Sequence, residues 1–132
     1  MWVCGTQVMD TPGLLDRPEE ERNEMERLTF ASLAHLPTAV IYVIDPSGLS
    51  GEKSNLDAQL NVRTYLKSRF PKRPWIDVVS KADLEIPAEV LARLPVGHLP
   101  ISVHTGENVD VLRGGIEGML LSLQDMLQSK NT

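Results

Sequence analysis

Apolar and polar residues follow two different periods along this chain, and the pattern predicts strands separated by helices. Short runs rich in β-branched and other apolar residues are typical of strands. Longer stretches with apolar residues three or four positions apart are typical of amphipathic helices. Four runs of the first kind occur, at Trp2–Asp10, Ala39–Asp45, Trp75–Ser80 and His98–Val103.

Two helices are predicted between the first three strands. Asp16 is a suitable N-cap, with Glu19 three residues on completing a capping box and Pro18 in the first turn, so a helix is expected from there to about Leu36. A second helix is expected over about Ser54–Phe70, where apolar residues recur at four-residue intervals before a proline.

The last helix has the clearest apolar stripe. Its members are Val109, Leu112, Ile116, Met119, Leu120, Leu123 and Leu127. Gly114, Gly115 and Gly118 weaken this helix, but they also allow close packing.

Regular alternation of strands and helices indicates an α/β fold, in which a doubly wound, mostly parallel sheet carries helices on both faces. In such sheets ligands bind beyond the carboxyl ends of the strands. The segments at those ends are the most polar in the pattern: Asp10–Gly13, Asp45–Gly51, Ser80–Asp83 and Ser102–Thr105. Asp77, inside an apolar strand, is interpreted as a carboxylate bonded to a neighbouring helix.

Composition narrows the class of protein. The 132 residues suit one domain, 1–132, with 42% hydrophobic and 23% charged residues. The single cysteine, Cys4, excludes an internal disulfide and favours a reducing compartment. A net charge of -5 opposes direct nucleic-acid binding by this domain. The longest apolar block, Ala39–Ile44, is far shorter than the ~20 residues of a membrane helix, so no membrane partner is expected.

Asp10-Thr11-Pro12-Gly13 follows the first predicted strand. There a carboxylate can hold Mg²⁺ through water, and a glycine lets a backbone N–H approach a terminal phosphate. The other interpretation is an ordinary turn, since Asp, Pro and Gly are common in turns.

Ser80-Lys81-Ala82-Asp83 follows the third predicted strand. An aspartate in such a place can accept two hydrogen bonds from the edge of a guanine ring, and a lysine stem can lie along the ring face. Alternatively, Asp83 is a helix N-cap and Lys81 is only solvated.

Ser102-Val103-His104-Thr105 and the residues to Val109 form a small polar loop between the last strand and the last helix. Here too a structural interpretation exists, with Thr105 or Asn108 as the helix cap.

In this order, and each after a strand, the three motifs resemble the GTP-binding domain of translation-factor-class GTPases. The segment from DTPGLLDRP through AHLPTAVIYVIDPS is similar to the nucleolar GTP-binding protein family, which is related to the Obg GTPases. HLPTAVIYV with WIDVVSKADL is closest to the plant and algal organellar branch. The likeness covers about residues 2–125.

The resemblance implies GTP or GDP and Mg²⁺ as cofactors, with Asp10 serving the metal. Nucleotide-binding residues would be Asp10, Thr11, Pro12, Gly13, Ser80, Lys81, Asp83, Ser102, Val103 and His104. It further implies GTPase activity in large ribosomal subunit assembly, a pre-ribosomal particle as partner, and the nucleolus, or the chloroplast for the organellar branch, as location.

Two departures qualify that expectation. Ser80 stands where the family has asparagine, so weaker guanine binding is expected. No G-x-x-x-x-G-K-[ST] phosphate loop occurs, and Gly48–Ser54 has the wrong span to replace it. The chain is therefore expected to be a partial GTPase domain lacking its first strands, with an incomplete catalytic core. The alternative is a nucleotide-free module that docks on a protein or ribosomal partner.

Overall fold

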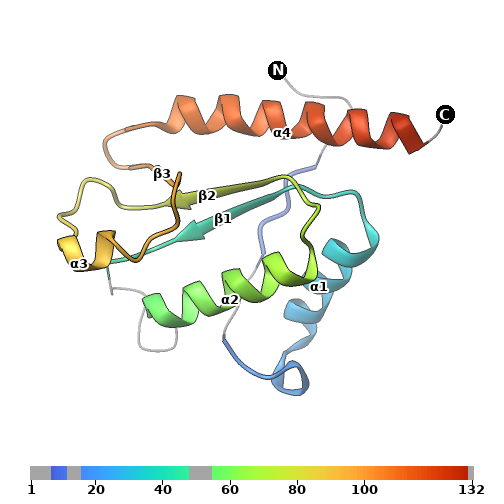
Figure 1. Ribbon diagram of the computed structural model, residues 1–132, viewed down its shortest axis with the longest axis horizontal. Coiled ribbons are helices and arrows are strands. Elements are labelled where there is room, and N and C mark those ends of the chain that lie inside the picture. Colours follow the sequence, from blue (N-terminus) through green and yellow to red (C-terminus); the bar gives the residue numbers. More distant parts are fainter. Residues whose placement is uncertain (1–6, 12–15, 48–54, 131–132) are drawn as a thin grey trace.

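The computed structural model describes residues 7–11, 16–47 and 55–130. Helices and strands alternate through most of this part of the chain (Figure 1). In chain order they are the 3₁₀ helix η1 (Glu19–Glu21), α1 (Glu24–His35), β1 (Val40–Ile44), α2 (Leu56–Arg69), β2 (Trp75–Val79), α3 (Ala88–Leu91), β3 (Leu99–Pro100) and α4 (Val109–Lys130).

The strands form one three-stranded sheet in the order β1-β2-β3. β1 pairs in parallel with β2 over its whole length, from Val40 opposite Trp75 to Ile44 opposite Val79. β2 also pairs in parallel with β3, where Val79 lies opposite Pro100. The predicted parallel α/β arrangement is confirmed for these strands, and all three carboxyl ends lie at the same edge.

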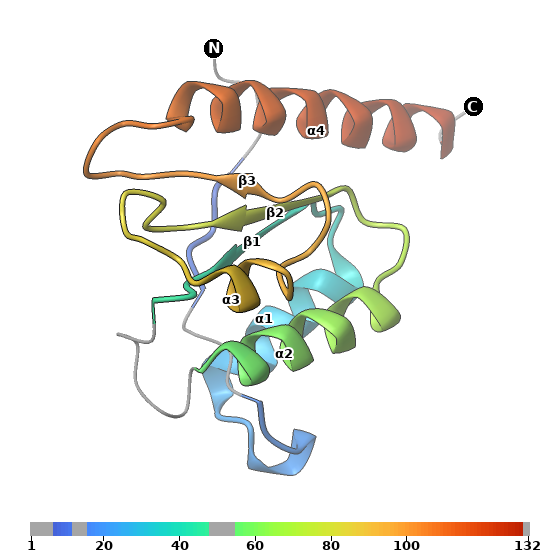
Figure 2. The same cartoon turned by 60° about the vertical axis from the view of Figure 1, so that its left-hand side comes forward.

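Helices cover both faces of the sheet. α4 lies along one face, and α1 and α2 lie on the other, in both views of the molecule (Figures 1 and 2). α2 is tied to β1 by the Tyr42 hydroxyl, which donates to the Gln59 carbonyl at 2.6 Å. α4 lies close to β2 at Gly115, where an added Cβ would lie 2.9 Å from Ile76 Cδ1.

The core lies where the carboxyl-terminal halves of β1 and β2 meet the helices. Ile44, Val78 and Val79 are at most 1% exposed. Val62 and Leu66 are the buried residues of α2, and Met119 is buried on α4. Burying such side chains contributes about 1.5–3 kcal/mol each. These buried residues therefore hold the carboxyl ends of β1 and β2 in place.

Asp77, the odd carboxylate of β2, is bonded to α2 as predicted. Its oxygens accept two hydrogen bonds from Arg63, at 2.7 and 2.8 Å, and a third from Trp75 Nε1 at 2.8 Å. Burial opposes ionisation of Asp77, but these hydrogen bonds outweigh it and lower the pKa of the carboxyl. The hydrogen bonding between Arg63 and Asp77 also raises the pKa of Arg63. The pair therefore clamps α2 to the sheet.

The predicted start of the first helix was wrong. Pro18 precedes the short η1 as its N-cap, and Arg22, which is extended with a ψ of 140°, separates η1 from α1. Asn23 caps α1 instead, and its capping box with Glu26 satisfies the backbone N–H groups at both residues. Asp16 does not cap; its carboxylate accepts from Asn61 of α2 at 3.0 Å. The predicted end near Leu36 is confirmed, because Leu36 is the C-cap.

Arg22 supplies a physical reason for that break. Its guanidinium lies 4.0 Å from the centre of the Phe30 ring and 4.8 Å from that of Tyr65. The extended backbone at Arg22 lets the side chain reach both rings, which a continuous helix from Asp16 would not favour. A cation–π contact of this kind contributes about 0.5–2 kcal/mol.

Two predicted strands also differ from the structure. Residues 7–10, the described part of Trp2–Asp10, form no strand, and their side chains are exposed. The strand predicted over His98–Val103 pairs only at Leu99–Pro100. Pro100 has no N–H for the ladder, although Ile101 N still donates to the Val79 carbonyl at 2.8 Å, and the chain turns from Val103 onward.

The other helices follow the pattern closely. α2 begins two residues later than predicted, after its N-cap Asn55, whose side chain accepts from Ala58 N at 2.8 Å. α4 begins at Val109, the first residue of its predicted stripe. The four-residue α3, which starts after Pro87, was not predicted. Within the ranges the structure describes, no helix has both the length and the apolar character to cross a bilayer.

Candidate functional site at the carboxyl edge of the sheet

The loop Ser80–Asp83 occupies the middle of the polar edge and is held from both sides. Ser80 N donates to the Ile44 carbonyl at the end of β1, at 2.9 Å. Ala82 N donates to the Ile101 carbonyl just beyond β3, also at 2.9 Å. Because these bonds extend the sheet past its last paired residues, the loop has a defined place relative to both neighbouring strand ends.

Asp83 and Ser102 lie side by side at this edge. Ser102 Oγ donates to Asp83 Oδ1 at 2.8 Å and accepts from Thr105 N at 3.1 Å. Ser102 is 0% exposed, so its hydroxyl is a fixed support for the carboxylate. The interpretation of Asp83 as a helix cap is wrong, because the next helix begins at Ala88 with Pro87 as its N-cap.

The loop after Ser102 closes on itself. Ser102 N donates to the Glu107 carbonyl at 3.2 Å, and Gly106 N donates to the Ser102 carbonyl at 2.8 Å. Gly106 has a φ of 81°, the left-handed region that glycine adopts without strain. Val103 and His104 follow Ser102 in this loop and are exposed to solvent.

Neither expected cap fully describes the start of α4. Thr105 Oγ1 accepts from Glu107 N at 3.3 Å, which supports the loop rather than the helix. Asn108 has a φ of 58°, and its side chain donates to the Pro100 carbonyl at 2.8 Å. Asn108 therefore joins the first turn of α4 to β3.

Lys81 reaches in the opposite direction from Asp83, toward the end of β1. Its ammonium lies 2.7 Å from Asp45 Oδ2 and 3.5 Å from Ser47 Oγ. Lys81 is thus ion-paired as well as partly solvated. Asp45 was placed at the polar edge by the strand pattern, but no role was predicted for it.

Gln59 is a further residue that the sequence did not reveal. Its amide oxygen accepts from Asp45 N at 2.7 Å, and its amide nitrogen donates to the Asp45 carbonyl at 2.8 Å. A glutamine at the end of the first turn of a helix carries no sequence signal for such a contact. Only the packing of α2 on β1 brings the two together.

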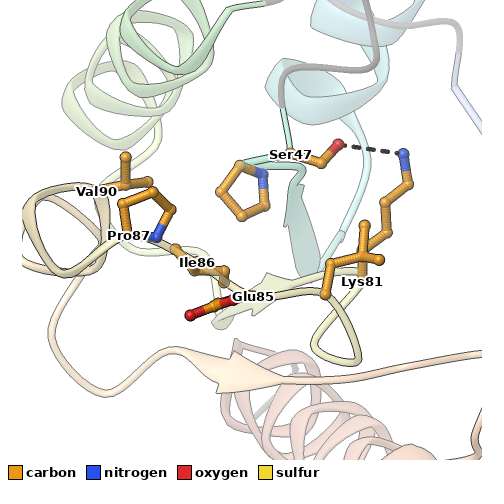
Figure 3. Close-up of a pocket in the computed structure, with 8 residues that line it drawn as sticks. Ser47, Lys81, Glu85, Ile86, Pro87 and Val90 are labelled. Atoms are coloured by element: carbon orange, nitrogen blue, oxygen red, sulfur yellow. Dashed lines mark hydrogen bonds between the residues drawn. The ribbon is translucent and has the colours of Figure 1, made fainter.

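A groove of about 350 Å³ lies beside Lys81, between the end of β1 and α3 (Figure 3). Apolar side chains supply most of its lining, and the Lys81 ammonium points toward Ser47 on one side. The lining residues are Pro46, Ser47, Lys81, Leu84, Glu85, Ile86, Pro87 and Val90.

The first motif is described only in part. Asp10 and Thr11 are exposed and belong to no strand, while Pro12 and Gly13 lie outside the described residues. Among the residues that the structure does describe, no group of three or more His, Cys, Asp or Glu could hold a metal.

Comparison with known proteins bears on the central part of this site. Residues 24–83 match the family model of Nucleolar GTP-binding protein 1. The proteins named Nucleolar GTP-binding protein 1 from Arabidopsis thaliana and Drosophila melanogaster are 42% identical over 78 residues and 38% identical over 84 residues. The protein of that name from Saccharomyces cerevisiae is 34% identical over 84 residues.

Over residues 24–83 the chain is similar to the nucleolar GTP-binding protein 1 family. The family match runs from α1 to Asp83 and so includes Asp45, Gln59 and Lys81. The aligned segments cover 59% to 64% of this chain but only 11% to 13% of these three relatives. The chain therefore aligns with only a small part of the length of these relatives.

Proposed function

We propose that this chain carries the guanine-recognition part of a GTPase. Asp83 would accept the donors on the edge of the guanine ring, and the Lys81 stem would lie along the ring face. Ser80, Ser102, Val103 and His104 would complete the base-binding edge. A GTP-binding family name at 34% to 42% identity supports guanine nucleotide as the ligand.

The observation that carries the proposal is the hydrogen bond between Ser102 and Asp83. These residues are 19 positions apart, and the three carboxyl ends bring them to one place. Each carboxylate oxygen can accept two hydrogen bonds, so Asp83 retains acceptors for a ligand while Ser102 holds one oxygen. Asp83 is exposed, so its remaining acceptor positions are accessible from solvent.

The names of the relatives support guanine nucleotide as ligand and the nucleolus as location for the complete protein. We propose that the complete protein hydrolyses GTP as a switch in assembly of the large ribosomal subunit, with a pre-ribosomal particle as its partner. The nucleolus is the proposed location, and a chloroplast location belongs to the proposal of an organellar branch. The switch would be the ordering of residues after Gly13 by the terminal phosphate, with release on hydrolysis.

For this chain alone, phosphate binding is expected to be weaker than binding of the guanine ring. The G-x-x-x-x-G-K-[ST] pattern, which cradles phosphates with backbone N–H groups, does not occur in the 132 residues. Mg²⁺ would neutralise phosphate charge in the complete domain, where Asp10 would serve as one of its ligands. We therefore propose that this chain alone binds guanine nucleotide weakly and does not hydrolyse GTP efficiently.

The test is a titration of the full chain with fluorescent GDP at concentrations up to the millimolar range. We expect a saturable signal that unlabelled GDP and guanosine compete away and that ADP does not. Asp83→Asn should abolish the preference for GDP over ADP, because the asparagine amide presents an N–H donor toward the donors of guanine. Asp57→Asn, in an exposed ion pair on α2, is the matched control and should bind like the unchanged protein.

A signal that ADP competes equally, or that survives Asp83→Asn, would contradict guanine recognition. Absence of binding by a folded chain would instead favour the alternative function, a nucleotide-free module that docks on a protein or ribosomal partner.

A further inference from the structure

The Asp45 carboxylate lies at the centre of a hydrogen-bonded group that guanine recognition alone does not require. Oδ2 pairs with the Lys81 ammonium at 2.7 Å. Oδ1 accepts from both the backbone N–H and the hydroxyl of Ser47, at 3.0 and 2.6 Å. The Asp45 side chain is only 17% exposed, so its two oxygens face these partners more than solvent.

The backbone of Asp45 is fixed as firmly as its side chain. The Gln59 amide spans its N–H and its carbonyl, at 2.7 and 2.8 Å. This contact replaces the sheet ladder, because Asp45 follows Ile44, the last residue of β1 that pairs with β2. The position of the Asp45 backbone is therefore fixed by α2 as well as by β1, and this limits where the carboxylate can lie.

The backbone of Lys81 also has a defined and unusual conformation. Its φ of 58° is left-handed, which is uncommon for a residue with a side chain. The bonds from Ser80 N to Ile44 and from Ala82 N to Ile101 hold the two neighbouring residues in place. The loop backbone thus sets the direction of the Lys81 Cα–Cβ bond. The ion pair with Asp45 sets the position of the ammonium group.

A lysine stem has four rotatable bonds and loses much rotamer freedom when it is ordered. If binding a ligand had to order it, the affinity would be lower by that cost. Here the ion pair orders the stem in advance, along one wall of the groove beside the loop (Figure 3). The side chain is 41% exposed, so one side of it remains accessible to a ligand.

We infer that Asp45 is a positioning residue that holds the Lys81 stem in the orientation used against a guanine ring, and that Gln59 in turn holds Asp45. This inference rests on the proposed function. It adds Asp45, just after β1, and Gln59 of α2 to a site whose motifs lie in the loops after β2 and β3. Asp45 acts through Lys81 and does not itself touch the nucleotide.

The first measurement needs no ligand. The full chain, Asp45→Asn and Asp45→Glu are treated briefly with acetic anhydride, and acetylation of each lysine is followed by mass spectrometry. An amine held in an ion pair reacts slowly, so Asp45→Asn should raise the Lys81 rate by about threefold or more relative to exposed Lys72. Asp45→Glu, which keeps the charge, should restore most of the protection.

The second measurement is a double-mutant cycle on fluorescent GDP binding. Asp45→Asn should weaken binding by about five- to tenfold, and Lys81→Met by at least as much. In a Lys81→Met background Asp45→Asn should have no further effect, because Asp45 then has no lysine to position. Gln59→Met should weaken binding in the same direction but less, whereas Asp57→Asn on the same helix should not.

The outcomes separate this inference from the proposed function. Equal Lys81 acetylation in a folded Asp45→Asn chain, or additive losses in the cycle, would overturn the positioning role. A merely structural Asp45 would weaken binding in the Lys81→Met background too. Loss of the guanine preference itself would contradict the proposed function, whereas the acetylation result would still report whether Asp45 orders Lys81. Circular dichroism of each variant identifies any that fail to fold, and Asp45→Glu then serves as the folded comparison.

Discussion

Ser102 donates its hydroxyl hydrogen to Asp83 across the end of the sheet, at an oxygen–oxygen distance of 2.8 Å. The serine is fully buried, and its oxygen also accepts the backbone N–H of Thr105. One hydroxyl therefore joins the loop after β2 to the loop after β3. It adds to the backbone hydrogen bond from Ala82 N to the Ile101 carbonyl, which also joins these two segments.

Ser102→Ala should lower the free energy of unfolding by about 1–2 kcal/mol, because the Thr105 N–H loses its acceptor and Asp83 loses a donor. Urea denaturation followed by circular dichroism measures the change. Ser68→Ala is the control, since its exposed hydroxyl bonds only a local helix carbonyl and should cost less than about 0.5 kcal/mol. Equal effects of the two substitutions would show that Ser102 does not support the edge.

Asp77→Asn should destabilise the fold more strongly. It leaves the Arg63 guanidinium, itself only 20% exposed, without its charge partner, for which we expect a loss of about 2–3 kcal/mol at pH 7. Asp57→Asn is again the control, because its ion pair with Arg93 is exposed. A loss in Asp77→Asn no larger than in the control would contradict the clamp between α2 and β2.

The Asp77 clamp also predicts a pH dependence with a definite sign. Because folding lowers the pKa of this carboxyl, its contribution is complete above the ordinary aspartate value of about 4 and is lost as the pH falls through the lower folded-state value. The stability difference between the unchanged chain and Asp77→Asn should therefore shrink on acidification below about pH 4. Urea titrations at pH 7, 4 and 3 test this, and a constant difference would contradict it.

Tyr42 gives the opposite dependence at high pH. Burial raises its pKa to about 12, and its hydroxyl donates to the Gln59 carbonyl at 2.6 Å. Stability from the protonated phenol is therefore complete below the ordinary tyrosine value of about 10 and falls as the pH rises toward 12. Tyr42→Phe should cost about 1 kcal/mol at pH 7, with a shallower decline above pH 10.

Denaturation at pH 8, 10 and 11 measures the Tyr42 contribution. Only the difference between the two proteins is informative, because other groups that titrate in this range are common to both. A parallel decline of the unchanged chain and Tyr42→Phe would show that the Tyr42 phenol ionises equally in the folded and unfolded states.

The strand-end rule predicted the edge but not all of its contacts. Three strands with one direction bring their carboxyl ends together whatever their side chains, so Asp83 and Ser102 could be placed near each other from the sequence alone. The Lys81–Asp45 pair could not, because it depends on a left-handed backbone at Lys81. No local pattern marks a lysine for that conformation.

The first helix shows a different limit of sequence reasoning. Asp16 with Glu19 and Asn23 with Glu26 are both acceptable capping boxes, and local propensity does not choose between them. The choice is made by distant partners: Asn61 binds Asp16, and the Tyr65 ring receives the Arg22 guanidinium. Both partners lie on α2, so tertiary packing decided where α1 begins.

The glycines of α4 allow a test of how closely this helix packs on β2. Gly→Ala in a helix normally adds about 0.5–1 kcal/mol, and at Gly114 and Gly118 an added Cβ meets nothing within 4 Å. At Gly115 it would lie 2.9 Å from Ile76 Cδ1, so the end of that isoleucine must move. We expect Gly118→Ala and Gly114→Ala to raise the free energy of unfolding measured in urea, and Gly115→Ala to gain clearly less because displacing Ile76 offsets the propensity. If all three substitutions stabilise equally, α4 does not contact the sheet at this glycine, and its position over β2 would be wrong.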